Sequence, residues 1–297
     1  MREATRVAFV STLASGALAV AKIAVGLSAS SAAVVSDGIE SAGDVLTSGL
    51  VFLAVRLAAK PADDDHPYGH GRVDILAGQA VGMVLVLAGV GICWRSLTHP
   101  VQVPALYAIW PLLASILIKS ALAFTKMRVG RRDGSSALIA DGWNDSVDIL
   151  SGLIALAAVL LAIFLPGWEW ADRWGGFLIG LIVLFLALRT IYQTTMHLMD
   201  TMPDARRMEQ IRIATFAVPG ALGVEKCFAR KTGSRYHVDM HLEVDPQLTV
   251  LESHDIATAV KNHLRRTVDW VEDVLVHVEP HLPQGEYGKS RHRAPVD

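Results

Sequence analysis

One apolar stretch, residues 31–56, carries carboxylates in a pattern that can bind a cation. Asp37, Glu40 and Asp44 recur at helical spacing, so they fall on about a third of the circumference of one helix. An ionised side chain at the centre of a bilayer costs ~2.5 kcal/mol or more, and such groups usually face a bundle interior and mark an ion path. Because Glu40 and Asp44 are one turn apart, they can close on a single ion. The spacing predicts a membrane-embedded site for a divalent metal ion.

A second apolar stretch, residues 137–165, repeats this ladder at an offset of 104 residues. Asn144 and Asp148 are one helical turn apart, as Glu40 and Asp44 are, so two neighbouring helices can offer oxygen ligands to one ion. The predicted transport site takes one pair from each helix: Glu40, Asp44, Asn144 and Asp148. Three further carboxylates are accessory polar groups on the same helices: Asp37, Asp141 and Asp145.

The ladder carboxylates also have a structural interpretation. They can be protonated, or they can hold helices together by pairing with a basic residue from another apolar run, the candidates being Lys22, Lys119 and Arg95. No basic residue lies within either ladder. We therefore favour the cation site.

A turn-rich segment, residues 61–71, brings together a second set of metal-ligating residue types. Asp63, His66 and His70 lie in the sequence Pro-Ala-Asp-Asp-Asp-His-Pro-Tyr-Gly-His-Gly. The proline and glycine between the two histidines rule out a regular helix, so a turn sets their spacing. From these residue types alone, the loop is either a metal site or a hydrated connector.

Composition indicates which elements position these residues. The chain has 297 residues, 52% of them hydrophobic, with a net charge of -2 and a mean hydropathy of +0.38. It is too apolar for one soluble domain and too neutral for nucleic-acid binding. Six stretches have about the 20 residues that span a bilayer core, namely 7–27, 31–56, 75–98, 105–127, 137–165 and 172–197. The predicted fold class is a polytopic α-helical membrane protein with six transmembrane helices.

Charges in the connections indicate the orientation. Lys and Arg residues concentrate at the N-terminus, in the second-to-third and fourth-to-fifth connections, and after the sixth span. This bias places both termini in the cytoplasm, and we expect the plasma (inner) membrane. No phosphate-binding glycine loop of an ATP-driven pump is evident.

After residue 200 the pattern is that of a small α+β domain. Strand-like alternation over 223–230, 236–245 and 274–279, with a helix before the first strand and another before the last, gives the order αββαβ, ferredoxin-like or metallochaperone-like. Thr249 and Glu252 form a capping box. Four residues of the helix it opens are expected to face the sheet: Leu251, Ile256, Val260 and Leu264. The expected domains are 1–200 for transport, 201–283 for this cytoplasmic domain and 284–297 as a disordered tail.

Together the two ladders, the histidine loop and the C-terminal domain resemble the cation diffusion facilitator family of metal/proton antiporters over nearly the whole chain. The most specific piece is His66-Pro-Tyr-Gly-His70-Gly at its distance from the first ladder. The resemblance implies that the four ladder residues form the transport site, that Asp63 and the two histidines form a cytoplasmic site, and that the C-terminal domain is a dimerising metal sensor. Positions matching that sensor's ligands in zinc members are Glu225, His241, His254, His277 and Glu279.

Four positions depart from the zinc-transporting pattern. Those members commonly have His at the place of Asn144 and His or Asp at that of Glu40, whereas this chain offers oxygen ligands at both. Oxygen suits harder ions such as Mn²⁺, and Fe²⁺ tolerates either. In the C-terminal domain, Glu225 stands where His is frequent and Glu279 where Asp is frequent. That domain therefore either binds metal through a changed ligand set or serves dimerisation alone.

The expected function is that of a secondary transporter, not an enzyme. It exports Mn²⁺, Fe²⁺ or Zn²⁺ in exchange for protons, because metal and protons compete for the same carboxylate oxygens. We expect a homodimer in the lipid bilayer, with the metal ion as substrate and regulator, no permanent cofactor and no nucleic-acid partner. The alternatives are a cation channel, or a non-transporting metal sensor or scaffold of the same fold.

Overall fold

The computed structural model describes residues 2–98, 100–133, 136–233 and 235–282. The chain divides into two compact units, one of residues 1–56 and 76–193, the other of residues 57–75 and 194–297. The histidine loop therefore groups with the C-terminal domain, although it lies between two predicted spans in the sequence. The expected disordered tail, 284–297, lies outside the described residues.

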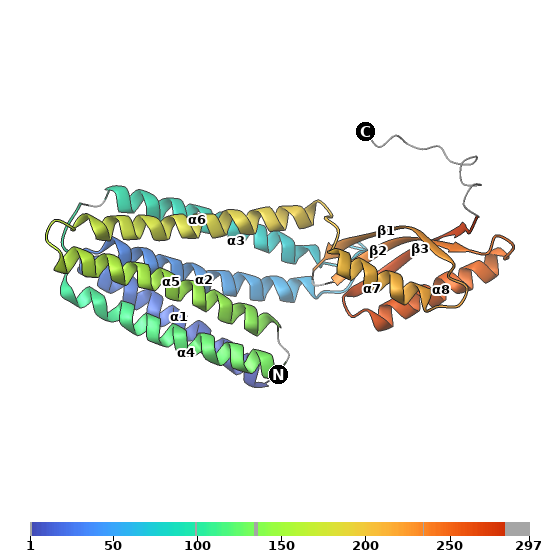
Figure 1. Cartoon of the computed structure of the whole chain (residues 1–297), viewed down its shortest axis with the longest axis horizontal. Coiled ribbons are helices and arrows are strands. Elements are labelled where there is room, and N and C mark those ends of the chain that lie inside the picture. The colour runs from blue at the N-terminus through green and yellow to red at the C-terminus, as the bar shows by residue number, and fades with distance from the viewer. Residues whose placement is uncertain (1, 99, 134–135, 234, 283–297) are drawn as a thin grey trace. The chain divides into compact units, whose positions relative to one another are not determined.

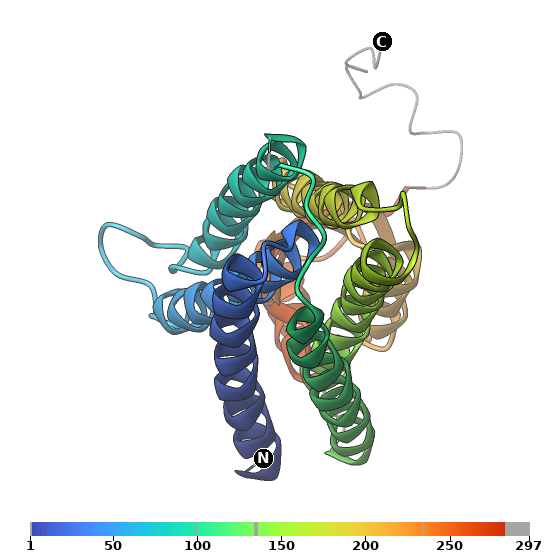
Figure 2. The same cartoon turned by 90° about the vertical axis from the view of Figure 1, so that its left-hand side faces the viewer.

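Six long helices, α1 to α6, form a bundle (Figure 1). Their bounds are α1 (Arg2–Ser28), α2 (Ala32–Ala58), α3 (Arg72–Thr98), α4 (Ile109–Asp133), α5 (Ser136–Phe164) and α6 (Trp170–Leu198), with a short 3₁₀ helix, Leu106–Ala108, before α4. Seen end-on in Figure 2, α1 lies beside α2, and α4 beside α5. Among the described residues, five of these helices are long and apolar enough to cross a membrane. The remaining one, α2, has 27 residues and carries the first ladder. The chain is a six-helix membrane protein, as predicted.

The bundle has an apolar exterior and a mixed interior. Large apolar side chains such as Leu87, Leu117 and Phe185 are exposed on its outside, as expected where lipid is the solvent. Three lysines, by contrast, are among its most buried side chains: Lys22, Lys119 and Lys126. A buried ammonium group needs a partner of opposite charge.

The first turn of α2 is capped by a residue from another helix. Asp172 of α6 is buried and accepts hydrogen bonds from the Ser31 hydroxyl at 2.5 Å and from the backbone N–H groups of Ala32 at 2.5 Å and Ala33 at 3.3 Å. A helix N-terminus leaves N–H groups unpaired and carries partial positive charge, so a carboxylate there stabilises it.

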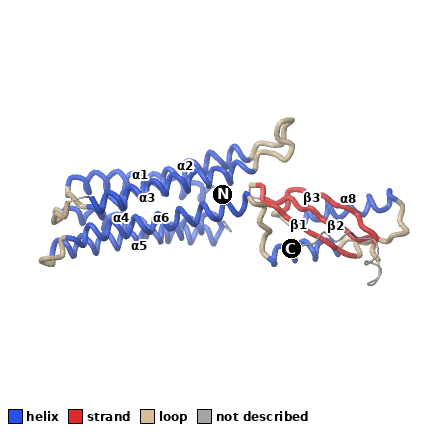
Figure 3. The backbone as a smooth tube through the Cα atoms, turned by 90° about the horizontal axis from the view of Figure 1, so that it is seen from above, coloured by secondary structure: helices blue, strands red, loops and turns tan. Residues whose placement is uncertain are grey.

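The C-terminal domain has the predicted αββαβ order (Figure 3). Its elements are α7 (Ala205–Phe216), β1 (Gly223–Thr232), β2 (Arg235–Val244), α8 (Val250–Thr267) and β3 (Val271–Pro280). The sheet order is β1-β2-β3, with β2 antiparallel to β1 and parallel to β3. Val238, Met240 and Leu242 alternate along β2 and are buried in one core with Val260 and Leu264 of α8. The helices thus cover one face of the sheet and leave the other to its polar residues.

Helix α8 confirms the capping box and corrects one core assignment. The Thr249 hydroxyl accepts from the Glu252 N–H, and the Glu252 side chain accepts from the Thr249 N–H. Val260 and Leu264 face the sheet as predicted, and Ile256 packs at the edge of the core. Leu251 does not, since it is 70% exposed. It lies nine residues before Val260, about half a turn around the helix from it.

Candidate metal-binding sites

Helices α2 and α5 bring together three of the four predicted transport residues. Glu40 of α2 accepts a hydrogen bond from the Ser151 hydroxyl of α5 at 3.0 Å. Asp44 of α2 and Asp148 of α5 approach the same ammonium group, that of Lys119. The two ladders therefore meet inside the bundle. Asn144, in contrast, is exposed.

Lys119, from α4, is the group on which these carboxylates converge. Its Nζ atom contacts Asp148 directly and lies 3.5 Å from Asp145 Oδ1 and 3.9 Å from Asp44 Oδ2. The Lys119 side chain is 2% exposed. The ion pairing that the sequence left as an alternative is thus present at this lysine. Arg95, the basic candidate on α3, pairs with none of these carboxylates among the described contacts.

The other two buried lysines repeat one arrangement in both halves of the bundle. Lys22 Nζ of α1 lies 2.8 Å from Asp37 Oδ2 and 2.6 Å from Ser41 Oγ. Lys126 Nζ of α4 lies 2.8 Å from Asp141 Oδ2 and 2.6 Å from Asp145 Oδ2.

These two lysines are separated by 104 residues, the same offset as the ladders. The internal repeat therefore covers α1–α2 and α4–α5. The ladders alone do not indicate this extent, whereas the matching positions of the two lysines in the sequence do.

A glycine after each repeated aspartate allows the paired helices to approach closely. A Cβ atom on Gly38 would lie 2.8 Å from Ile23 Cγ1 and 2.9 Å from the Ile23 backbone nitrogen. A Cβ atom on Gly142 would lie 3.0 Å from Met127 Cγ and 3.3 Å from the Ala123 carbonyl oxygen. The Asp-Gly pairs thus combine an ion pair with a tight helix crossing.

Asn144 lies at the edge of the face of α5 that pairs with the lysines. The face of α5 that pairs with α4 contains Asp141, Asp145 and Asp148, spaced at i, i+4 and i+7. Asn144 is about 100° from Asp145 but only about 40° from Asp148 around the helix. Its membership of the transport site remains a prediction.

Glu40 has the carboxylate oxygen most clearly open to an ion. Its Oε1 atom is bonded to Ser151, whereas its Oε2 atom is buried and has no hydrogen-bond partner among the described residues. Burying a polar oxygen without a partner is unfavourable. A cation or a proton would satisfy it.

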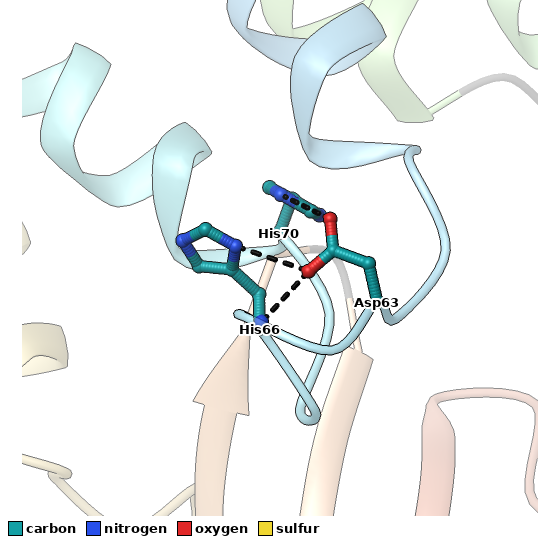
Figure 4. Close-up of side chains that lie close together, drawn as sticks. All are labelled: Asp63, His66 and His70. Carbon is teal, nitrogen blue, oxygen red and sulfur yellow. Dashed lines mark hydrogen bonds and ion pairs between the residues drawn. The ribbon is translucent and has the colours of Figure 1, made fainter.

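The histidine loop gathers its three predicted ligands (Figure 4). Asp63, His66 and His70 each offer an atom to a group in which all atoms lie within 4.8 Å of one another. The Asp63 carboxylate lies 3.2 Å from His66 Nδ1 and 3.5 Å from His70 Nε2, and the two imidazole centroids are 4.4 Å apart. This geometry suits one metal ion bound by two imidazoles and a carboxylate.

Backbone contacts hold the loop ligands in place. The His66 N–H donates to Asp63 Oδ1 at 2.7 Å, and this bond lowers the pKa of Asp63. His70 Nδ1 lies 3.3 Å from the Pro61 carbonyl oxygen. A carbonyl at that nitrogen favours a proton on Nδ1 and leaves Nε2, which faces Asp63, as the ligand atom. The turn includes Gly69 at φ +76°.

The loop also contacts the sheet of the same unit. The Tyr68 ring lies edge-on to the His237 ring. The Arg230 guanidinium stacks over the Tyr68 ring, 5.6 Å from the centroid of that ring. Arg72 pairs with Asp200 at 3.0 Å. Sequence periodicity could not predict these contacts, because the partners are more than 100 residues apart.

A second cluster lies on the polar face of the sheet. His241, His277 and Glu279 offer ligand atoms within 4.8 Å of one another, and His241 Nδ1 lies 3.0 Å from Glu279 Oε1. Glu225 reaches to 3.8 Å from the same nitrogen, from a point where the β1–β2 register is irregular. Such bulges re-aim side chains. His254 is apart from this cluster, on α8, where its Nε2 lies 3.5 Å from the Thr258 hydroxyl.

Comparison with known proteins decides the family. Residues 8–199 match the cation efflux transmembrane domain, and residues 203–281 match the cation efflux protein cytoplasmic domain. The chain belongs to the cation diffusion facilitator family. It is therefore an integral membrane protein of a family of metal efflux transporters, which confirms the expected resemblance.

Relatives align with nearly the whole chain. The manganese efflux system protein MneP of Bacillus subtilis is 30% identical over 287 residues, covering 94% of this chain and 97% of that one. An uncharacterized transporter of Methanocaldococcus jannaschii is 31% identical, covering 94% of this chain and 99% of that one.

A solved structure of MamM-CTD is 32% identical to this chain and covers 26% of it and 96% of that chain, with a TM-score of 0.25.

Proposed function

We propose that this protein exports a divalent transition-metal ion from the cytoplasm in exchange for protons, with Mn²⁺ and Fe²⁺ preferred over Zn²⁺. The observation that carries the proposal is the convergence of Glu40, Asp44 and Asp148 from α2 and α5 inside a bundle of membrane-spanning helices. Family membership supports metal efflux, and the name of the Bacillus subtilis relative supports manganese as cargo.

The transport site in this proposal consists of Glu40, Asp44, Asn144 and Asp148. All four provide oxygen ligands, which suit Mn²⁺ and Fe²⁺ better than the imidazoles of zinc sites. Asn144 completes the set when an ion enters, by turning its amide oxygen towards Asp148 on the same helix.

Proton exchange follows from the carboxylates. A metal ion binds only the deprotonated form, so metal and protons compete for the same oxygens. Protonation on the outer side releases the metal, and deprotonation on the cytoplasmic side prepares the site for the next ion.

The proposal extends to the assembly and its regulation. The protein acts as a homodimer in the plasma (inner) membrane with both termini in the cytoplasm, residues 1–200 forming the transport domain and 201–283 the cytoplasmic one. Metal bound at Asp63, His66 and His70, and at the cluster of His241, His277 and Glu279, regulates transport. The gathering of three ligand atoms at each place supports both sites.

Proteoliposomes containing the purified protein and a pH-sensitive dye test this function. We expect Mn²⁺ and Fe²⁺ to drive proton flux more strongly than Zn²⁺, and Asn144→His to shift the preference towards Zn²⁺. Metal flux without proton counterflow would indicate the channel. Absence of flux with every metal would refute transport and favour a scaffold. Faster flux with Zn²⁺ than with Mn²⁺ and Fe²⁺ would refute the cargo preference.

A further inference from the structure

The second half of the internal repeat contains a charge that the first half lacks. At the offset of 104 residues, Lys119 matches Ser15, and Asp145 matches Ser41. Three further charged positions correspond, Lys22 with Lys126, Asp37 with Asp141 and Asp44 with Asp148, whereas Glu40 matches the neutral Asn144. Lys119 is therefore a buried charge that the second half has in addition to the shared residues, and its role must be explained separately.

The position of Lys119 supplies that reason. Its ammonium group contacts Asp148 and lies 3.9 Å from Asp44, so it touches one proposed ligand from each ladder. Lys22, which is equally buried, pairs with Asp37 and Ser41 and touches none of the four proposed ligands. Of the two, only Lys119 places a positive charge where the transported ion is expected.

We propose that Lys119 is the internal cation of the transport site, which occupies the site's carboxylates when no metal is bound and excludes monovalent ions from it. The inference rests on the proposed transport site. The buried Asp148 and the partly buried Asp44 would repel each other without a counter-ion, and the tethered ammonium offsets this cost in the metal-free state.

Charge selection follows from the competition. A tethered group has a high effective concentration at its own site, so a free ion must bind much better than the ammonium to displace it. Na⁺ or K⁺ would replace one positive charge by another and gain little. A divalent ion brings one more positive charge to the same oxygens and gains Coulomb energy. Lys119 thereby makes the site selective for divalent cations.

The displaced ammonium has a second partner. Asp145 Oδ1 lies 3.5 Å from Lys119 Nζ, while the other oxygen of Asp145 is held by Lys126 at 2.6 Å. When a metal ion takes Asp44 and Asp148, the Lys119 ammonium can stay paired with Asp145. Asp145 then binds the displaced Lys119 ammonium. The first half of the repeat has Ser41 at this position and no such carboxylate.

Equilibrium binding of Mn²⁺ to the full-length purified protein tests this inference. The background carries His66→Ala, His70→Ala and His241→Ala, so that the loop and sheet clusters do not contribute. Lys119→Gln and Lys119→Met remove the charge, Lys119→Arg retains it, and Lys22→Gln is the matched control for the loss of a buried ammonium. Each protein is titrated in choline chloride and in sodium chloride of equal ionic strength.

We expect Lys119→Gln and Lys119→Met to bind Mn²⁺ about tenfold more tightly in choline chloride, because a positive charge within ~4 Å of the ion is gone. Sodium should weaken binding by both variants, and leave the background protein, Lys119→Arg and Lys22→Gln unaffected. A merely structural lysine would not create this sodium sensitivity. Lys119→Met is included in case Lys119→Gln does not fold, because methionine keeps an apolar side chain close in length to the lysine stem.

Unchanged or weaker Mn²⁺ affinity without sodium sensitivity, in either folded variant, would overturn the inference and leave the proposed function standing. If the background protein bound neither Mn²⁺, Fe²⁺ nor Zn²⁺, the proposed transport site would fall, and the role of Lys119 with it.

Discussion

Helices α1–α2 and α4–α5 are two versions of one arrangement, and they differ in how their charges are enclosed. Both contain a lysine paired with an aspartate at 2.8 Å and a glycine after that aspartate. Asp37 is 2% exposed, whereas Asp141 is 45% exposed. The first pair is sealed and the second is open at one end. The same helix-pair arrangement therefore holds a fully buried ion pair in one half and a partly exposed one in the other, although each half contributes carboxylates to the proposed transport site.

The largest expected effect concerns the ladder positions that match between the halves. Asp44→Asn and Asp148→Asn should each reduce metal-driven proton flux at least about a hundredfold, because a lost ligand should cost at least as much as a lost outer-shell partner. Flux in proteoliposomes is the measurement, and Ser48→Ala is the control on the same helix. Full flux in either variant would break the equivalence of the two ladders and refute the site.

Glu40 and Asn144 occupy the ladder position at which the two halves differ, and substitutions there should have unequal effects on flux. Glu40→Gln should reduce flux about tenfold or more, since it removes a buried charge with a free oxygen. Asn144→Ala should have a smaller effect, because Asn144 is neutral and exposed. Flux at saturating Mn²⁺ and the apparent Mn²⁺ affinity distinguish them. Equal losses would mean that Asn144 contributes as fully as Glu40.

The paired aspartates should differ in their contribution to stability. Asp37→Asn leaves the Lys22 ammonium buried without a carboxylate, which should lower the free energy of unfolding by about 3 kcal/mol. Asp141→Asn should lower it by about 1 kcal/mol or less, since Asp141 is half exposed. Lys126 also keeps Asp145. Unfolding by sodium dodecyl sulfate titration in detergent measures both, and equal losses would contradict the sealed-and-open distinction.

The smallest single effect is expected at Gly142, for which Gly38 is the matched comparison. Gly38→Ala places a methyl group against the Ile23 backbone and should lower the free energy of unfolding by about 1–3 kcal/mol. Gly142→Ala meets chiefly the flexible Met127 side chain, and alanine is better than glycine in a helix by about 1 kcal/mol, so the net change should be close to zero. The same titration applies. A larger loss at Gly142 would reverse the order.

Much of the fold follows from local patterns in the sequence. Long apolar runs predict the six spans, and alternation in β2 and the Thr249–Glu252 capping box predict the C-terminal elements, because these signals act over a few residues. The prediction for Leu251 was wrong because Leu251 and Val260 lie about half a turn apart around α8, so both cannot face the sheet. The loop contacts with Tyr68 depend on distant partners that no local pattern specifies.

The candidate transport site was predictable in its residue types and, as an alternative, in two of its buried lysines, Lys22 and Lys119, but not in Lys126. The ladders on α2 and α5 identify carboxylates that meet inside the bundle. Which face of each helix turns inward is decided by lysines on other helices, Lys22 on α1 and Lys119 and Lys126 on α4. Asp145, which contacts two of these lysines, is buried, whereas Asn144 is exposed. The cluster of Asp63, His66 and His70 could be predicted from local sequence, because one turn contains all three residues.

The capping of α2 by Asp172 determines which parts of the bundle can move as one body. Two backbone N–H groups and one hydroxyl at the start of α2 donate to this single buried carboxylate of α6. A rocking motion that turned α2 while leaving α6 in place would break all three bonds at once. Helices α2 and α6 should therefore move as one rigid body. Helix α6 then moves together with Glu40 and Asp44, although it contributes no ligand to the proposed transport site.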